Sequence, residues 1–356
     1  MVKRLVVVTI LLASFRPAEA ATFRFFGSGG VESQFTPANE SSPLNPDNVA
    51  GLPRTTTLAD ASAFGELLTD DKRWKLRVKL RGEASDRAGE SLELGEGFIQ
   101  VRATPWLSVT AGRVIEKWGT GYAWTPTAFV GPKRDPSDPG DRRSAYRGAD
   151  LLRADLYVSE TTLSLYTLEG GSVAARVYRL IGATDVALHA RDSSLGISAA
   201  RVFGDALELH GEVARDADAD ALRAVVGGQY TFSNDLNVVL EIYHGTDGLT
   251  RREWDAFRGS INDDLREANA RYAPLRMGRT YGFIRLSRDF GRTAAEVIAI
   301  ASLRDGSSMV RTTISRDLYD RLTLQLIATE FTGSPTSEWS HVQLERIVIA
   351  GMRVHF

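Results

Sequence analysis

Hydrophobic and polar positions alternate with a period of two along most of this chain, in segments of about ten residues. The cleanest segment runs from Arg73 to Arg81, where every odd position is cationic and every even position is apolar. Successive side chains of a β-strand point to opposite faces. The pattern therefore predicts strands whose two faces meet different environments, one apolar and one polar.

Counting these segments predicts eighteen strands in an all-β fold, a closed antiparallel transmembrane β-barrel. We expect the strands to start near residues 22, 59, 73, 90, 106, 149, 161, 173, 185, 195, 205, 221, 236, 278, 292, 308, 321 and 344. The long connections then share one side of the barrel, with the longest near 116–148 and 247–277. The alternative is sixteen strands, with residues 22–72 forming an N-terminal plug.

One segment falls out of phase. Leu92 and Leu94 do not share the parity of Ile99 and Val101. A β-bulge at 95–97 would restore the alternation, because one extra residue on a strand shifts its faces.

Composition narrows the class of protein. The 356 residues include 43 Lys and Arg, 45 Asp and Glu, and no cysteine, for a net charge of −2. No nucleic-acid partner is expected from this balance, and disulfides and thiol chemistry are excluded. Beyond residue 20, no apolar run approaches the roughly 20 residues of a transmembrane helix. A membrane-spanning chain without such helices is expected to be a barrel, since lipid tolerates no unpaired backbone groups.

The N-terminus has the pattern of a secretory signal peptide. Lys3 and Arg4 precede the apolar run 5–15, and Ala18 and Ala20 form a small-x-small cleavage site. We expect residues 1–20 to be removed and residues 21–356 to form the barrel. A buried N-terminal helix is the alternative interpretation.

The C-terminal strand supports the same compartment. From Leu344 onward, Val348, Ala350, Met352 and Phe356 share one face, and the chain ends on Phe356. A terminal strand that closes on Phe resembles the assembly signal of bacterial outer-membrane β-barrels. That resemblance implies a Gram-negative cell outer membrane, contact with its lipid, and the barrel-assembly machinery as a partner.

The connection 116–148 is rich in Gly, Pro and aromatic residues, so we expect it to fold inward and narrow the lumen. A solvated surface loop is the alternative. The residues expected in this constriction loop are Trp118, Gly119, Gly121, Tyr122, Trp124, Pro126 and Asp135.

The second long connection has a helical pattern between Thr250 and Pro274. Trp254, Phe257, Ile261 and Leu265 recur every three or four residues, on one face of a helix. This spacing predicts a helix that lies over the barrel mouth as a lid, or alternatively one that binds a partner.

The stretch Gly112-Arg113, followed by Trp118-Gly119-x-Gly121, Pro126, Pro132 and Asp135, resembles a segment of the alginate-export-like and related porin-like families. The motif covers about forty residues, and the general barrel resemblance covers nearly the whole mature chain. The resemblance implies an inward loop and passive passage of a polar solute, of the small-molecule or oligosaccharide type.

Charged residues on the polar faces are the candidate pore lining. If the even positions of 73–81 face lipid, the cations of this strand must face the lumen, because charges in lipid cost about 2–4 kcal/mol each. Such a row favours anions, unless Glu66, Glu93, Asp135 or Asp138 neutralises it. The complete set of expected pore-lining residues is Arg73, Lys75, Arg77, Lys79, Arg81, Arg113, Lys133, Arg134, Arg153 and Asp155.

Enzymatic chemistry is not expected. Glu208, His210 and Glu212 share one strand face at a spacing that metal ligands could use, but a luminal wall needs such charges anyway. No nucleophile elbow, zinc signature or phosphate loop occurs, so no metal and no cofactor are predicted. His244, near an outer rim, is the one candidate for catalysis. The sequence favours a channel over a non-conducting structural or adhesive barrel, and over an outer-membrane enzyme.

Overall fold

The computed structural model describes residues 21–131, 135–137 and 147–356. The predicted signal peptide and its cleavage site lie outside these residues. The described residues form eighteen β-strands. They are β1 (Ala21–Phe35), β2 (Thr55–Thr69), β3 (Trp74–Ser85), β4 (Gly89–Thr104), β5 (Leu107–Val114), β6 (Ala149–Val158), β7 (Thr161–Leu168), β8 (Val173–Ile181), β9 (Thr184–Arg191), β10 (Ser194–Phe203), β11 (Leu207–Asp216), β12 (Ala221–Thr231), β13 (Asn237–Gly245), β14 (Thr280–Phe290), β15 (Thr293–Ser302), β16 (Ser308–Tyr319), β17 (Leu322–Thr332) and β18 (Arg346–His355).

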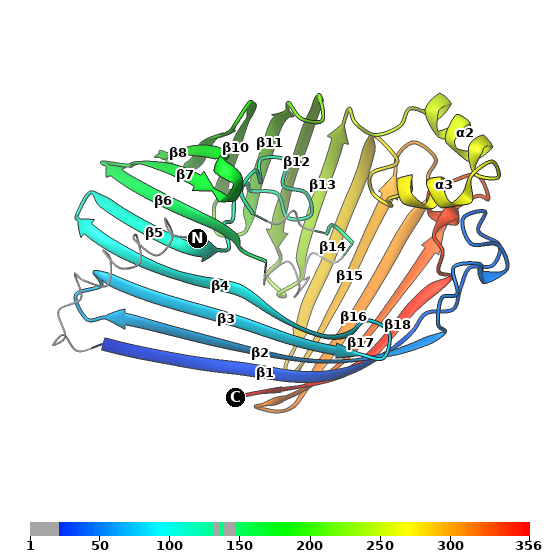
Figure 1. Cartoon of the computed structure of the whole chain (residues 1–356), viewed down its shortest axis with the longest axis horizontal. Helices are drawn as coiled ribbons and strands as arrows, with labels where there is room; N and C mark the ends of the chain where they lie inside the picture. Colours follow the sequence, from blue (N-terminus) through cyan, green and yellow to red (C-terminus); the bar gives the residue numbers. More distant parts are fainter. Residues whose placement is uncertain (1–20, 132–134, 138–146) are drawn as a thin grey trace.

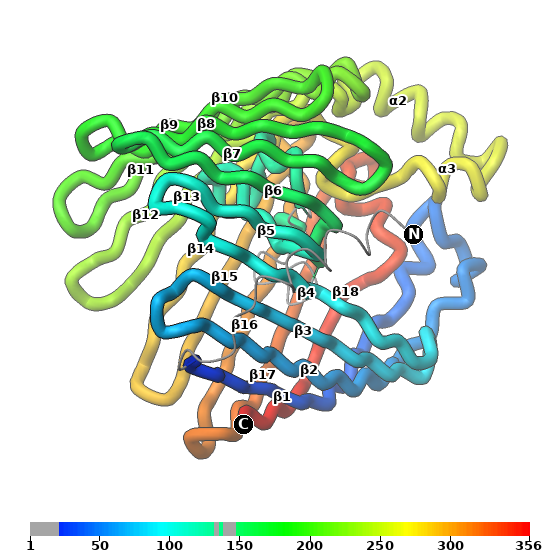
Figure 2. Tube along the Cα trace, turned by 60° about the vertical axis from the view of Figure 1, so that its left-hand side comes forward, coloured from blue at the N-terminus to red at the C-terminus, as the bar shows by residue number. Residues whose placement is uncertain are grey.

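Each strand pairs antiparallel with its neighbours in sequence, and β1 also pairs with β18. The sheet is therefore a closed barrel, as Figures 1 and 2 show. The predicted eighteen-stranded antiparallel barrel is confirmed. The sixteen-stranded alternative is wrong, because β1 and β2 are both wall strands and leave no N-terminal plug.

Connections alternate between the two ends of the barrel because neighbouring strands run in opposite directions. The connections 36–54, 115–148, 246–279 and 333–345 share one end, which we call the long-loop end. Short turns such as 105–106, 159–160 and 291–292 share the other end, which we call the turn end.

The two faces of the wall differ as the alternation predicts. Leu76, Val78 and Leu80 on β3 are 46%, 37% and 38% exposed on the outward face, whereas Lys75 and Arg77 point inward and contact Glu66 of β2. The same alternation holds on β18, where Met352 and Val354 are exposed outward. An apolar belt therefore surrounds a polar lumen.

The predicted β-bulge on β4 is present. Lys79 pairs with Glu96 and Leu80 pairs with Leu94, which leaves Gly95 as the extra residue. The bulge returns Leu92 and Leu94 to the outward face, where both are exposed.

The predicted helix at 250–274 is two short helices, α2 (Arg251–Ser260) and α3 (Leu265–Arg271), rather than one. Thr250 caps α2, and the Asp264 side chain accepts the N–H of Glu267 to start α3. A capping residue in the middle of the apolar repeat breaks the helix there. Both helices lie at the long-loop end beside the connection 36–54 (Figures 1 and 2). No helix among the described residues is long and apolar enough to cross a membrane.

The seam between β1 and β18 depends on a glycine. The Gly27 N–H donates to the carbonyl of Phe356 (2.8 Å), and the Phe356 N–H donates to the carbonyl of Gly27 (3.0 Å). A Cβ atom on Gly27 would lie 2.4 Å from the Phe356 ring and 2.9 Å from the carbonyl oxygen of Ser62. The terminal aromatic ring therefore occupies the space that a side chain at position 27 would need.

We expect Gly27→Val to destabilise the barrel by about 1–3 kcal/mol, the usual cost of overpacking. The temperature at which the folded band is lost on a heat-modifiability gel should fall. Gly29→Val is the matched control, since it lies on the same strand and face and its nearest atom would be 3.7 Å away. Equal transition temperatures for the two variants would contradict this account of the seam.

Candidate functional site: the luminal constriction

The connection after β5 turns into the barrel and packs against the inner wall. Trp118 is 2% exposed and lies 5.2 Å from Tyr166 of β7 and 5.1 Å from His189 of β9, between ring centroids. Phe129 packs against the edge of the same indole. The expected inward fold of this loop is therefore observed for its described residues, and the face they contact is the luminal face.

The loop continues along the wall toward β14. Trp124 stacks on Tyr243 of β13 at 5.2 Å and also contacts Tyr281 and Phe283 of β14. Beyond it, the carbonyl of Ser137 accepts a hydrogen bond from Arg311 of β16. The described contacts of the loop, with that of Glu116 to Arg153 of β6, thus run along the wall from β6 to β16.

A buried carboxylate on β11 anchors the loop backbone. Glu212 is 2% exposed and accepts four hydrogen bonds, from the N–H groups of Thr120 (2.5 Å), Gly121 (2.7 Å) and Thr127 (3.0 Å) and from the Thr127 hydroxyl (2.7 Å). Hydrogen bonds to an ionised acceptor are among the strongest in proteins. These bonds satisfy the buried charge and fix the loop at the same time.

Glycine at position 119 is required by this approach. Gly119 has φ +89°, which favours glycine, and a Cβ atom there would lie 2.5 Å from Glu212. Gly121 is equally restricted, because its Cβ would lie 1.9 Å from the carbonyl oxygen of Trp124.

A second carboxylate, Glu241 of β13, holds the next part of the loop. It accepts from the N–H groups of Tyr122 and Ala123, the latter at 2.9 Å. Its other partner is His210 Nε2 at 2.8 Å, and His210 Nδ1 lies 3.0 Å from Glu208. The polar face predicted for β11 is luminal, but Glu212 and His210 are buried and support the loop. The period-two spacing of these residues predicted that they share one face of the strand. Their partners could not be predicted, because the loop amides and Glu241 lie far away in the sequence.

Arg153 and Asp155 of β6 face the lumen, as expected, but they lie beneath the loop. Their side chains are 19% and 7% exposed, and they form an ion pair at 2.9 Å. Arg153 also pairs with Glu116 at the start of the loop. These charges are part of the loop's attachment to the wall.

The cation row of β3 is paired with acids on the inner wall. Lys75 and Arg77 both contact Glu66, at 3.0 and 2.6 Å, and Arg77 also lies 3.7 Å from Glu96. Arg81 pairs with Glu83 on its own strand at 2.6 Å. Of the four acids that the sequence suggested as neutralising groups, Glu66 contacts this row directly, and Glu93 is opposite Arg81 in the register of β3 and β4. Asp138 lies outside the described residues.

Other expected pore-lining residues lie elsewhere. Arg113 was expected in the lumen but lies on the outward face, because it shares the parity of Val109 and Ala111, and it pairs with Asp150 at 2.8 Å. Arg73 belongs to the turn before β3 and lies 3.8 Å from Asp71.

Only some of the residues predicted for the pore lining and the constriction loop are among the described residues. Lys133 and Arg134 lie outside the described residues. Asp135 is exposed and accepts the N–H of Ser137, and Pro126 is buried within the loop.

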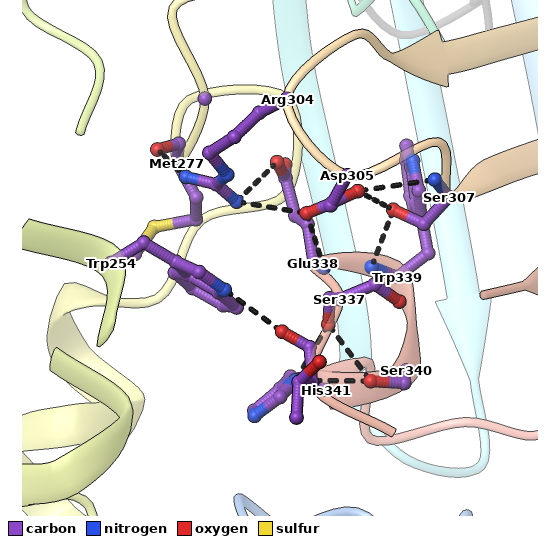
Figure 3. Close-up of polar contacts among 12 residues, drawn as sticks. Trp254, Met277, Arg304, Asp305, Ser307, Ser337, Glu338, Trp339, Ser340 and His341 are labelled. Carbon is purple, nitrogen blue, oxygen red and sulfur yellow. Dashed lines mark hydrogen bonds and ion pairs between the residues drawn. The ribbon is translucent and has the colours of Figure 1, made fainter. Parts of the chain in front are cut away.

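The connections at the long-loop end form a second polar cluster, which we call the loop clasp (Figure 3). Its centre is Glu338, which has no exposed surface and accepts the Tyr281 hydroxyl at 2.8 Å and the Leu275 N–H at 3.0 Å. Arg304 lies 3.4 Å from Glu338 and 3.2 Å from Asp305, which in turn accepts the Glu338 N–H. The clasp thereby joins four segments of chain.

Apolar packing surrounds the clasp. Trp254 of α2 lies under the Arg304 guanidinium, 4.5 Å from its ring centroid, and donates its indole N–H to the carbonyl of Thr336. Leu44, Phe257, Ile261, Ala268 and Met277 complete the buried cluster with Trp254. The helices are therefore fixed to the rim, and their role as a lid stays a prediction.

The sequence analysis did not predict an active site. In the structure, His244 and His189 lie on different faces of the wall and have different partners. His244 faces outward and contacts the Thr280 hydroxyl at 2.9 Å, while His189 contacts Ser198. Within the described ranges, no three His, Asp or Glu side chains are grouped as a metal site requires.

No protein-family model matches this chain, and no curated protein matches it. Solved structures of a porin from Rhodopseudomonas blastica are similar to it in fold. A triple mutant of that porin has a TM-score of 0.51 and 15% identity, covering 94% of this chain and 100% of the porin. A multiply substituted variant has a TM-score of 0.51 and 13% identity with the same coverage. At these identities the similarity establishes the porin-like fold alone.

We expect Glu212→Ala to release the loop, because each buried donor left without an acceptor costs about 1–3 kcal/mol. Amide hydrogen exchange over 118–127 should become faster, as measured by mass spectrometry in detergent. Glu208→Ala is the control, because Glu208 contacts His210 and no loop amide. Unchanged exchange in Glu212→Ala would show that Glu241 and the aromatic contacts hold the loop without Glu212.

The loop clasp should weaken as pH rises. Burial raises the pKa of Glu338 from 4.5 to about 7. A carboxyl with a raised pKa favours the folded clasp in its protonated form, so its contribution is complete below pH 4.5 and is lost as pH rises through 7. Tryptic cleavage within α2 should be faster at pH 8 than at pH 5.5, after correction for the protease's own pH dependence on an unfolded substrate. Glu338→Gln should abolish the difference, and a pH dependence that survives this change would assign it to another group.

Proposed function

We propose that this protein is a porin-like channel of the bacterial outer membrane that passes small polar solutes. The observation that carries the proposal is an anchored inward loop, which two buried carboxylates, Glu212 and Glu241, hold along one part of a polar lumen. A solvent-exposed surface loop would not need buried carboxylates inside the barrel to hold its backbone. The porin-like fold supports the same assignment.

Membrane placement is supported by the outward face of the wall. Large apolar side chains such as Ile197, Val226, Leu240 and Leu326 are 45–63% exposed there. Apolar patches of this extent are unfavourable in water and typical of a lipid-facing belt. The predicted signal peptide and the strand ending in Phe356 support export and assembly in the outer membrane.

A cavity with both polar and apolar lining on the luminal wall supports the choice of solute. It has a volume of about 230 Å³ and lies where β16, β17, β18 and β1 meet. Its luminal lining consists of Glu32, Ser315, Thr323, Gln325, Gly351, Arg353 and His355. Hydroxyl, amide and charged groups of both signs suit a hydroxylated solute, so we retain sugars and small oligosaccharides as candidates.

Selectivity by charge should be weak. Glu66 and Glu96 lie against Lys75 and Arg77, and Asp60 neutralises Arg353 through bonds of 2.5 and 3.0 Å. A row of paired cations attracts anions less than a bare row would. We therefore propose a modest anion preference that is set by the acids on neighbouring strands as much as by the cations.

We expect Glu66→Gln to raise the anion-to-cation permeability ratio, because it leaves Lys75 and Arg77 without their main counter-charge. The double variant Lys75→Gln with Arg77→Gln should lower the ratio. Reversal potentials in planar bilayers under a salt gradient measure both effects. Glu330→Gln removes the same charge from the outward face of β17 and should change nothing. If Glu66→Gln leaves the reversal potential unchanged, permeating ions do not pass close to the inner face of β2 and β3.

The alternative is a non-conducting structural or adhesive barrel, which the extensive anchoring of the loop would also permit. The same bilayers decide between them. Discrete conductance steps with the wild-type protein are expected for a channel, and their absence in repeated insertions would favour the alternative.

A further inference from the structure

Four arginines lie at one level on the outward face of the barrel, near the turn end. Arg179, Arg201, Arg288 and Arg316 belong to β8, β10, β14 and β16, and each comes two or three residues before the last residue of its strand. All four strands run toward the turn end. We call these four residues the arginine belt.

Register places each side chain outward. Arg201 pairs with Leu209 of β11 and Arg316 with Leu324 of β17, and both leucines are exposed on the apolar face. Arg288 pairs with Ala295, and Arg179 shares its face with Val177 and Ile181. Since β-strand side chains alternate, none of the four can reach the lumen.

The belt has no counter-charge among the residues that the structure describes. The residues that pair with the four arginines on adjacent strands are all neutral. They are Thr161, Val186, Thr184, Leu209, Ala295, Thr293 and Leu324. Within the part of the chain that the structure describes, none of the four guanidinium groups forms an ion pair. Arg288 Nε is buried and has no hydrogen-bond partner at all.

Outward arginines near the opposite end are arranged differently. Arg113 pairs with Asp150 through two hydrogen bonds of 2.8 and 3.0 Å, Arg215 lies 3.8 Å from Asp220, and Arg346 pairs with Glu345. Outward strand arginines near the long-loop end are thus neutralised by the chain itself, whereas the four belt arginines are not. Arg292, in a turn at the turn end, does pair with Asp320 at 3.0 Å, so the absence of a partner is a property of the belt and not of every cation at this end. This difference indicates that the counter-charge of the belt comes from outside the protein.

Aromatic rings fix the height of the belt. The Arg201 guanidinium lies 4.9 Å from the Phe203 ring centroid, and the Arg288 guanidinium lies 4.9 Å from that of Phe290. Both rings are about half exposed on the outward face. In transmembrane barrels, girdles of aromatic residues flank the apolar band at both interfaces. The arginines therefore lie at the depth where an apolar belt gives way to phosphate.

We propose that the arginine belt binds the phosphate groups of anionic phospholipids in the leaflet at the turn end of the barrel. The planar guanidinium donates in a fork that matches phosphate oxygens, and the lipid tails can follow the apolar belt above each arginine. A free phosphate ion could use the fork but not the belt. The proposal rests on the membrane placement proposed above and is independent of conduction.

The test is retention of lipid by the purified full-length barrel. The wild type is reconstituted in vesicles of phosphatidylcholine and phosphatidylglycerol, re-extracted in mild detergent, and its bound lipids are counted by native mass spectrometry. We expect enrichment of phosphatidylglycerol over phosphatidylcholine. A Gln substitution at all four belt positions should abolish it, with about a fivefold loss for each site.

The matched control carries Gln at Arg113, Arg215 and Arg346, which changes nearly the same charge at the paired end and should retain the enrichment. Heat-modifiability shows whether each variant is folded, and the single variants Arg201→Gln and Arg288→Gln serve if the fourfold variant is not. Equal enrichment in the belt and control variants, or none in the wild type, would overturn the proposal. Displacement of phosphatidylglycerol by inorganic phosphate would assign the belt to free anions and also overturn it. Bilayer conductance of the belt variant should be unchanged, so failure of this proposal is distinguishable from failure of the channel.

Discussion

Closure of the sheet is the constraint on which the rest of this structure depends. A strand with a free edge leaves backbone N–H and C=O groups without partners, and these are costly in lipid. Pairing of β1 with both β2 and β18 removes that edge. Once the wall is closed, every strand has one face in each environment, and the luminal face becomes available for polar groups that lipid would not tolerate.

The lumen uses that freedom unevenly. Along β7 to β14, acidic side chains accept backbone N–H groups of the inward loop, and aromatic rings cover the remaining contact surface. Along β1 to β3 and at β18, acids instead meet cations of the wall itself, as Glu66 does with Lys75 and Asp60 with Arg353. Acidic residues therefore fix the inward loop in one sector and reduce the net charge of the wall in another.

Most of the fold could be predicted from the local alternation of apolar and polar residues in the sequence. Strand positions, the bulge at Gly95 and the shared side of the long loops follow from period two and connection length alone, because each strand meets two environments. Arg113 shows the limit of motif reasoning, since its place in a familiar-looking segment suggested the lumen while its parity with Val109 and Ala111 placed it outward. Glu212 and Glu241 could not be recognised as anchors, because their partners are backbone amides that lie about a hundred residues away along the chain.

The seam at Gly27 and Phe356 joins nearly the first and the last residues of the described chain. A contact between such distant residues forms slowly, because the long stretch of chain between them loses conformational entropy when its ends are brought together. One edge of β1 stays unpaired until β18 is in place. A chain without β18 would leave that edge free to pair with another strand nearby. Closure of the whole wall therefore depends on a single junction, where one aromatic ring lies against a residue without a side chain.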